Sequence, residues 1–338
     1  MAGGRLRADV KRTSVLRRIP PSRLLRFVAA PGLEGYVCAL QLSLESRPIV
    51  VEAVSGRAMT LVPGDIFLAT AGYRESTRWV VGGISKRGLV PGNYYWVLTE
   101  SGVVGELAGG TSRAKSHLGQ AKFLGTVVGE DGRTVTIGQF AAAAADGSPD
   151  YGAPVFLIVG TSAEVGKTTS GLTILRTLLD NGHTNVVVLK ATGTSGVTEI
   201  VTYRDYGAAQ VFDCVDFGLP TTYPSNRKGI ARVFDKALDT CLSTPADAVL
   251  IECGGDMLGA NVPVFLERLK RRRPRAQVIL AAADAIGALG ATRMLRGLGL
   301  SVDLITGPCT DTLTLRRRTE TLCKVPAINM ARSDDLPD

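Results

Sequence analysis

The sequence predicts an α/β protein in which a doubly wound, mostly parallel sheet follows a smaller, β-rich N-terminal domain. Residues 151–330 alternate apolar, strand-like runs with segments of helix length, and this alternation is typical of a parallel sheet covered by helices. Residues 27–145 instead contain short apolar runs separated by turn signals. A chain of 338 residues with 45% hydrophobic and 21% charged residues has the size and composition of a two-domain globular protein.

The first 26 residues are predicted to form a basic, flexible arm. They hold much of the excess behind the net charge of +8. They lack the apolar centre of a signal peptide, and an organelle transit peptide is the alternative. Because this charge lies in one terminal segment without interleaved aromatic residues, a nucleic-acid partner is not expected.

The remaining composition indicates a cytoplasmic protein with no membrane partner. No stretch of about 18 apolar residues is free of charge, so no membrane span is predicted. The six cysteines form no Cys-x-x-Cys pair and the chain has two histidines. Reduced cysteines are therefore expected, and a zinc site is not.

Short strands account for the N-terminal domain. They are predicted at residues 37–44, 49–54, 58–62, 66–71, 79–81, 94–98, 103–104, 125–128 and 134–137. The last two flank Glu130-Asp131-Gly132, which favours a hairpin. Turns at such short intervals are typical of a small β-sandwich or barrel. Residues 141–149 have the composition of a linker.

A phosphate-binding loop opens the second domain. Five apolar residues, 155–159, lead into Gly160-Thr161-Ser162-Ala163-Glu164-Val165-Gly166-Lys167-Thr168-Thr169, and leucines at helical spacing follow. Strand, glycine-rich loop and helix in this order are the context of a P-loop, so all ten residues are predicted to bind a nucleotide. Lys167 would reach the β- and γ-phosphates, and Thr168 would hold Mg²⁺. Because five residues rather than four separate the two glycines, a turn that binds nothing is the alternative.

Five further strands and three further helices are predicted in this domain. The strands are at residues 186–189, 211–215, 248–251, 278–282 and 302–305, and the helices at 228–242, 263–269 and 288–298. We expect the strand at 186–189 to lie beside the P-loop strand. Ligands of such sheets bind at the carboxyl ends of the strands, so the residues after each strand are the informative ones.

Four of these strand ends carry candidate functional residues. Lys190 is predicted to hold an anionic acceptor beside the γ-phosphate, with a solvated loop lysine as the alternative. Asp216 and Glu252 are predicted to bind Mg²⁺. The alternatives are a turn-capping aspartate and a buried structural carboxylate. Gly307 and Pro308 are predicted to touch the nucleotide base.

Residues 160–168 resemble the P-loop of dethiobiotin synthetases, Gly-Thr-Asp-x-Glu-Val-Gly-Lys-Thr, including its five-residue spacing. Residues 190–196 resemble that family's Lys-Pro-x-x-x-Gly loop, and residues 252–255 its Glu-Gly-x-Gly-Gly element. Residues 191–196 and 212–217 are also similar to motifs of the DUF1611 family. The resemblance covers residues 151–330 and none of the first 145.

The resemblance implies roles for individual residues. Lys167 and Thr168 would bind phosphate and Mg²⁺, Lys190 would bind the substrate, and Asp216 and Glu252 would complete the metal site. The family's proline after the lysine is replaced here by alanine, and an N-terminal domain is added. The substrate therefore stays open.

Together these residues predict an enzyme that uses ATP and Mg²⁺ to phosphorylate a small-molecule substrate or to activate it for ligation, as a homodimer. Lys167, Lys190 and Glu252 are the predicted catalytic residues, and kinase and ligase chemistry both stay open. One alternative is an acyltransferase of the DUF1611 kind that holds a phosphate-bearing carrier. The other is a regulatory or delivery P-loop NTPase, although no segment rich in histidine and cysteine favours metal delivery.

Overall fold

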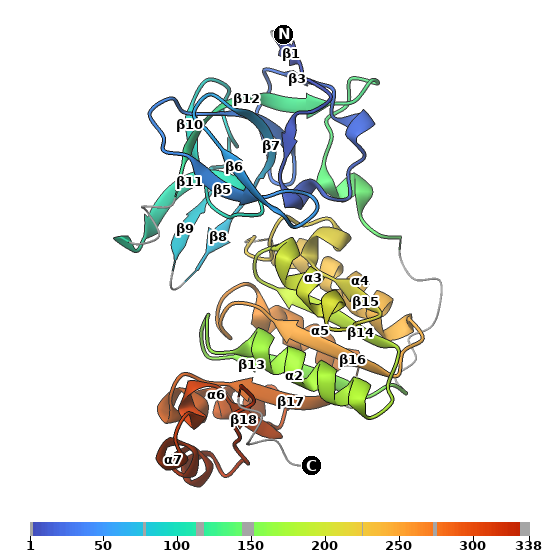
Figure 1. Ribbon diagram of the computed structural model, residues 1–338, viewed down its shortest axis with the longest axis vertical. Helices are drawn as coiled ribbons and strands as arrows, with labels where there is room; N and C mark the ends of the chain where they lie inside the picture. Colours follow the sequence, from blue (N-terminus) through green and yellow to red (C-terminus); the bar gives the residue numbers. More distant parts are fainter. Residues whose placement is uncertain are drawn as a thin grey trace. The chain divides into compact units, whose positions relative to one another are not determined.

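The structure is a computed structural model that describes residues 3–76, 79–112, 118–143, 152–224, 226–272 and 276–331 (Figure 1). It divides into two compact units. Unit 1 contains Met1–Ala143, Thr194–Thr198 and Cys214–Pro224, and unit 2 contains Ala144–Gly193, Glu199–Asp213 and Ser225–Asp338. The predicted domain limits at 145 and 151, and most of the predicted linker, lie outside the described residues. Two short segments that the sequence assigned to the second domain therefore belong to unit 1.

Unit 1 is built from short strands and single turns of 3₁₀ helix. The strands are β1 (Gly3–Arg5), β2 (Lys11–Arg12), β3 (Arg26–Val28), β4 (Val37–Leu42), β5 (Ile49–Glu52), β6 (Ala58–Leu61), β7 (Ile66–Ala71), β8 (Arg74–Glu75), β9 (Val80–Gly83), β10 (Tyr94–Val97), β11 (Val103–Gly110) and β12 (Gln120–Val128). The 3₁₀ turns are η1 (Ser14–Leu16), η2 (Pro21–Arg23), η3 (Ile137–Phe140) and η4 (Cys214–Phe217). Residues 134–137, predicted as a strand, make only isolated bridges at Thr134 and Thr136 before η3 begins.

Five of these strands close into a barrel. β12 pairs with β4, β4 with β7, β7 with β11, β11 with β10, and β10 again with β12. The β7–β11 pair is parallel and the other four are antiparallel. Closure leaves none of the five with an unpaired edge. The structure therefore selects the barrel from the two architectures that the sequence left open.

The N-terminal segment packs against this barrel, so the prediction of a flexible arm is wrong for residues 3–26. Along β4, Cys38 and Leu40 belong to one hydrophobic cluster, whereas Val37 belongs to a second cluster that contains Val15 and Leu16. Val15 and Leu16 are both fully buried. Burying one such side chain contributes roughly 1.5–3 kcal/mol, so this packing favours an ordered segment.

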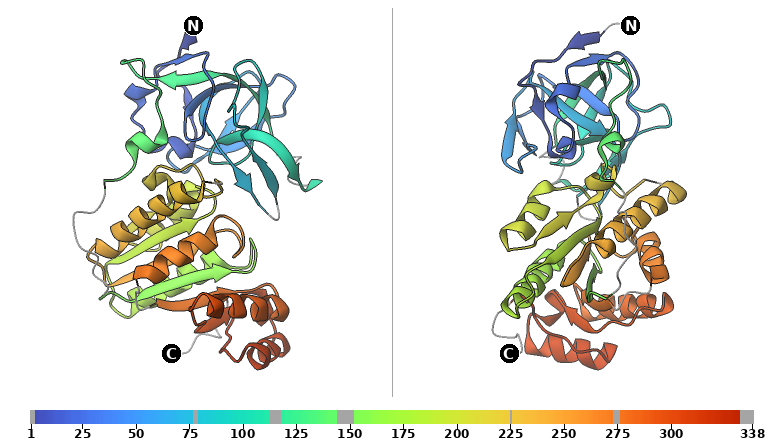
Figure 2. Two further views of the ribbon diagram at one scale, coloured as in Figure 1. Left: turned by 180° about the vertical axis from the view of Figure 1, so that it is seen from behind. Right: turned by 90° about the vertical axis from the view of Figure 1, so that its right-hand side faces the viewer.

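Unit 2 is a six-stranded parallel sheet with helices on both faces. Its strands are β13 (Val155–Gly160), β14 (Val186–Thr192), β15 (Gln210–Phe212), β16 (Ala248–Cys253), β17 (Ala276–Ala281) and β18 (Leu304–Thr306). Its helices are α2 (Lys167–Asp180), α3 (Val197–Asp205), α4 (Arg227–Ser243), α5 (Val262–Arg272), α6 (Ala285–Gly297) and α7 (Leu313–Cys323), and a 3₁₀ turn, η5 (Pro308–Thr310), follows β18. Figures 1 and 2 show α2 and α3 on one face of the sheet and α4 and α5 on the other. The predicted α/β fold class is confirmed.

The strand order corrects one expectation. The order is β15-β14-β16-β13-β17-β18, so β16 lies between the P-loop strand β13 and β14. Glu252 on β16 is the register partner of Ile158 on one side and of Lys190 on the other. The carboxyl ends of these three strands therefore still meet at one edge of the sheet. None of the helices in the described part of the chain is both long and apolar enough to cross a membrane.

Candidate functional site

The P-loop joins β13 to α2 and ends in an open helix N-terminus. Gly166 has a φ of 88°, in the left-handed region that glycine tolerates, and no side chain caps the helix that begins at Lys167. A Cβ atom at Gly166 would meet nothing within 4 Å. The first N–H groups of a helix have no partner within it and carry partial positive charge, so this end is suited to a phosphate.

Lys167 lies across Gly160, which explains why glycine is needed at the end of β13. A Cβ atom at Gly160 would lie 2.8 Å from Cδ of Lys167. The ammonium of Lys167 donates to the carbonyl oxygen of Ser162 at 2.8 Å, which keeps it within the loop. Burial lowers the pKa of Lys167, although the nearby carboxylate of Glu252 opposes the shift.

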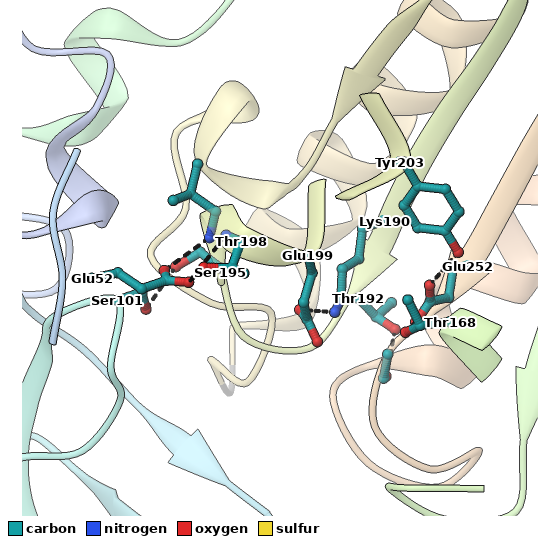
Figure 3. Close-up of polar contacts among 12 residues, drawn as sticks. Glu52, Ser101, Thr168, Lys190, Thr192, Ser195, Thr198, Glu199, Tyr203 and Glu252 are labelled. Carbon is teal, nitrogen blue, oxygen red and sulfur yellow. Dashed lines mark hydrogen bonds and ion pairs between the residues drawn. The ribbon is translucent and has the colours of Figure 1, made fainter. Parts of the chain in front are cut away.

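Glu252, at the end of β16, is the centre of a small hydrogen-bond network (Figure 3). Its Oε1 accepts from the hydroxyl of Thr168 at 3.0 Å, and its Oε2 accepts from the hydroxyl of Tyr203 at 2.7 Å. The side chain is 2% exposed. Burial and the Glu252 carboxylate raise the pKa of Tyr203 well above its usual value, so the phenol remains a donor.

The chemistry of this pair fits Mg²⁺. A hydroxyl and a carboxylate are oxygen ligands of the kind that Mg²⁺ takes from a P-loop and from the adjacent strand. Within the described part of the chain, no group of three or more His, Cys, Asp or Glu side chains could hold a metal by itself. An ion beside Thr168 and Glu252 would therefore take its other ligands from nucleotide phosphates and water.

Lys190 lies at the same edge of the sheet and forms an ion pair with Glu199 of α3 (Figure 3). Its side chain is only 5% exposed, which does not fit the alternative of a solvated loop lysine. Its Cε packs over Gly254, where an added Cβ atom would lie 3.3 Å away. A buried ammonium needs a counter-charge, and Glu199 provides it. The sequence instead predicted that an anionic acceptor would pair with Lys190.

Asp216 is placed apart from the predicted metal ligands. β15 ends at Phe212, so Asp216 does not stand at the strand tip but in η4, which belongs to unit 1. Its two carboxylate oxygens pair with Arg17 at 2.9 Å and with Arg18 at 3.0 Å. The structure thus gives Asp216 two cationic partners, and we do not include it in the metal site proposed below.

Gly307 follows β18 and lies against the P-loop, and Pro308 begins η5. A Cβ atom at Gly307 would lie 2.7 Å from the carbonyl oxygen of Val165. The neighbouring loop after β17 also braces the P-loop, because the hydroxyl oxygen of Thr161 accepts from the N–H of Ala283 at 3.1 Å. Contact of Gly307 and Pro308 with a nucleotide base stays a prediction.

The sequence alone did not predict α3, which carries both Glu199 and Tyr203. One signal was present, because Gly171 is an isolated glycine in the helix after the P-loop and such a glycine often marks a close approach. Nor did the sequence predict a role for Glu52. Within unit 1, the Glu52 carboxylate accepts from the N–H groups of Val197 and Thr198, at 2.9 and 3.0 Å. These two residues begin α3, where a carboxylate stabilises the helix. The Glu52 carboxylate also accepts from the hydroxyl of Thr198 (Figure 3).

No protein-family model and no curated protein matches this chain. Among solved structures it is similar to the signal recognition particle receptor FtsY from Elizabethkingia anophelis, at 20% identity and a TM-score of 0.33 over 45% of this chain and 49% of that one. It is also similar to the cell division protein FtsY from Thermotoga maritima, at 19% identity and a TM-score of 0.38 over 58% and 67% of the two chains. A third is the 54 kDa signal recognition particle protein from Aeropyrum pernix in complex with GDP, at 16% identity and a TM-score of 0.36 over 54% and 41%.

These similarities concern the fold. In this chain, β13, the glycine-rich loop after it and α2 form a P-loop in a parallel sheet. The chain spans about half the length of the first structure, and none of the three is described as a kinase, a ligase or a dethiobiotin synthetase. The comparison contradicts the prediction of an ATP-dependent kinase or ligase, which we withdraw. It also lends no support to a dethiobiotin-synthetase or DUF1611 relationship, or to ATP as the nucleotide.

Proposed function

We propose that this protein is a regulatory P-loop NTPase, which binds a nucleoside triphosphate with Mg²⁺ and changes conformation when the nucleotide is hydrolysed. The observation that carries the proposal is the contact between Thr168 and Glu252 at the open start of α2. A hydroxyl from the P-loop helix and a carboxylate from the adjacent strand are the two protein groups that a Mg²⁺–nucleotide site requires.

Each residue of the site has a role in this proposal. Thr168 and Glu252 would hold Mg²⁺, which when bound neutralises charge on the β- and γ-phosphates. Lys167 would contact the same phosphates, and the N–H groups at the start of α2 would donate to their oxygens. Phosphoryl transfer to water depends mainly on positioning and charge, which these groups would supply.

A switch explains two features that a metabolite kinase does not. The buried Lys190 already has a counter-charge in Glu199, which leaves no cation assigned to an acceptor. The segments that follow β14 and β15, Thr194–Thr198 and Cys214–Pro224, are built into unit 1. Segments that change order or position with the γ-phosphate are a common basis of nucleotide switching. A change in either segment would be a change within unit 1.

The test combines hydrolysis with hydrogen exchange. GTP and ATP are supplied separately to the wild type and to Lys167→Ala, and released phosphate is measured. We expect turnover of at least one nucleotide, and its loss in Lys167→Ala. Exchange of backbone amides in residues 194–205 and 214–224 should differ between the triphosphate-analogue and diphosphate states. Equal exchange in the two states would contradict the regulatory role, and the absence of any nucleotide binding would contradict the whole proposal. A homodimer and a cytoplasmic location stay predictions.

A further inference from the structure

We propose that Tyr203 is a positioning residue that sets the orientation of the metal-binding carboxylate of Glu252. This inference rests on the proposed function. Tyr203 comes from α3, and its side chain is completely buried. Its hydroxyl lies 2.7 Å from Oε2 of Glu252, while the hydroxyl of Thr168 lies 3.0 Å from Oε1 (Figure 3). The two oxygens of one carboxylate therefore have different partners.

The helix that follows the P-loop is shaped to admit this contact. Gly171 lies in the interior of α2, where glycine costs about 1 kcal/mol relative to alanine. A Cβ atom at Gly171 would overlap the hydroxyl oxygen of Tyr203. The glycine thus gives the tyrosine hydroxyl a path across α2 to Glu252. A purely structural tyrosine would need no such opening at its polar tip.

A neutral donor suits this role better than a cation. The Tyr203 hydroxyl fixes Oε2 without cancelling the negative charge of Glu252, so Oε1 remains a charged ligand next to Thr168. The ammonium of Lys190, on the neighbouring strand, pairs with Glu199 instead. Groups that hydrogen-bond a ligating carboxylate orient it, and losing one typically lowers metal affinity about 10–100-fold.

Two variants remove the contact by independent routes. Tyr203→Phe deletes the hydroxyl and keeps the ring, and Gly171→Ala displaces the hydroxyl while leaving both Tyr203 and Glu252 in place. Tyr206→Phe is the control for the first change, because Tyr206 is 50% exposed. Gly290→Ala is the control for the second, because a Cβ atom at Gly290 of α6 would meet nothing within 4 Å.

The measurement is the affinity for fluorescent mant-GDP and mant-ADP across a Mg²⁺ titration and in EDTA. We expect both test variants to need about tenfold more Mg²⁺ for half-maximal tight binding, and to match the wild type in EDTA within about twofold. Both controls should match the wild type throughout. Thermal unfolding identifies a variant that does not fold, and the other variant then decides the result.

The outcomes separate the inference from the proposed function. If the wild type binds neither nucleotide in a Mg²⁺-dependent way, the proposed function fails. If the wild type shows Mg²⁺ dependence and a folded test variant retains it within twofold, the role of Tyr203 is wrong and the proposed function stands. A variant that loses affinity equally in Mg²⁺ and in EDTA also overturns the positioning role, because the damage is then not specific to the metal.

Discussion

The hydroxyl of Thr168 lies 3.0 Å from Oε1 of Glu252, although 84 residues separate them in the sequence. β13 and β16 are neighbours in the parallel sheet, so the helix that follows one strand starts beside the last residues of the other. The pairing of two strands thus places a P-loop hydroxyl on a carboxylate, and this relationship underlies the predictions below.

Glu252→Gln tests the role of the negative charge beside Thr168. The amide keeps a carbonyl oxygen for one hydrogen bond but loses the negative charge that favours Mg²⁺. We expect the Mg²⁺-dependent part of nucleotide affinity to fall about tenfold or more, with the affinity in EDTA unchanged. Nucleotide titrations in both conditions measure this. Glu267→Gln, an exposed change on α5, is the matched control and should have no effect.

Gly160→Ala tests the position of Lys167 in the P-loop rather than the metal site. The added methyl group would lie 2.8 Å from Cδ of Lys167 and 3.0 Å from Cγ2 of Val165, so the lysine must move. Because the lysine contacts phosphate directly, nucleotide affinity should fall about tenfold or more in Mg²⁺ and in EDTA alike. Gly297→Ala, where a Cβ atom meets nothing within 4 Å, should leave both affinities unchanged. A Gly160→Ala protein with wild-type affinity would show that the lysine is not held in this position.

Asp216→Asn separates an ion-pair anchor from a metal ligand. Removing the charge leaves Arg17 and Arg18 without their carboxylate, and the free energy of unfolding of unit 1 should fall by about 1–3 kcal/mol. Both tryptophans, Trp79 and Trp96, belong to unit 1, so tryptophan fluorescence during urea unfolding reports this unit. The Mg²⁺ dependence of nucleotide binding should be unchanged. A selective loss of that dependence would restore Asp216 as a metal ligand.

Asp235→Asn should have an effect on stability that depends on pH. Burial alone would raise the pKa of Asp235, but hydrogen bonds from Arg268 at 2.5 Å and Arg272 at 2.8 Å hold it below its usual value. A lowered carboxyl pKa contributes stability above the pKa of the unfolded chain, about 4, and this contribution is lost as the pH falls through the folded value.

At pH 7 the Asp235→Asn variant should therefore be less stable than the wild type by about 1–2 kcal/mol, and the difference should shrink below about pH 4. Far-UV circular dichroism follows the helices of unit 2 during unfolding. Asp180→Asn is the control, because its ion pair with Arg176 is exposed and should contribute less than about 0.5 kcal/mol. A difference that is equally large at acid pH would contradict the role of the carboxylate charge.

The parts that could be predicted from the sequence depend on local patterns. The residues from Gly160 to Thr168 join an apolar strand to a helix, and Glu252 is the last residue but one of another strand. Sequence order alone therefore places them at one edge of a parallel sheet. The strand order could not be predicted in this way, because no pattern within a strand specifies which strands pair with it on either side.

Other features could not be predicted because they depend on contacts between residues that are far apart in the sequence. The partners of Asp216 are Arg17 and Arg18, about 200 positions earlier, and no local pattern links them. The basic charge of the first 26 residues predicted a solvated arm, although the segment contains Val15 and Leu16. Their burial depends on a hydrophobic cluster shared with residues of β4, which the local sequence does not show. Helix α3 was missed because its nine residues are too few to show a clear apolar periodicity.

The most direct test is a calorimetric titration of the wild type with the slowly hydrolysed analogues GTPγS and ATPγS, in Mg²⁺ and in EDTA. We expect binding of at least one analogue, about tenfold or more tighter with Mg²⁺, and loss of that binding in Lys167→Ala. Absence of binding to either analogue at ~1 mM, a concentration that would detect even very weak affinity, would contradict the proposed nucleotide site. Equal affinity with and without Mg²⁺ would contradict the assignment of Thr168 and Glu252 as its ligands.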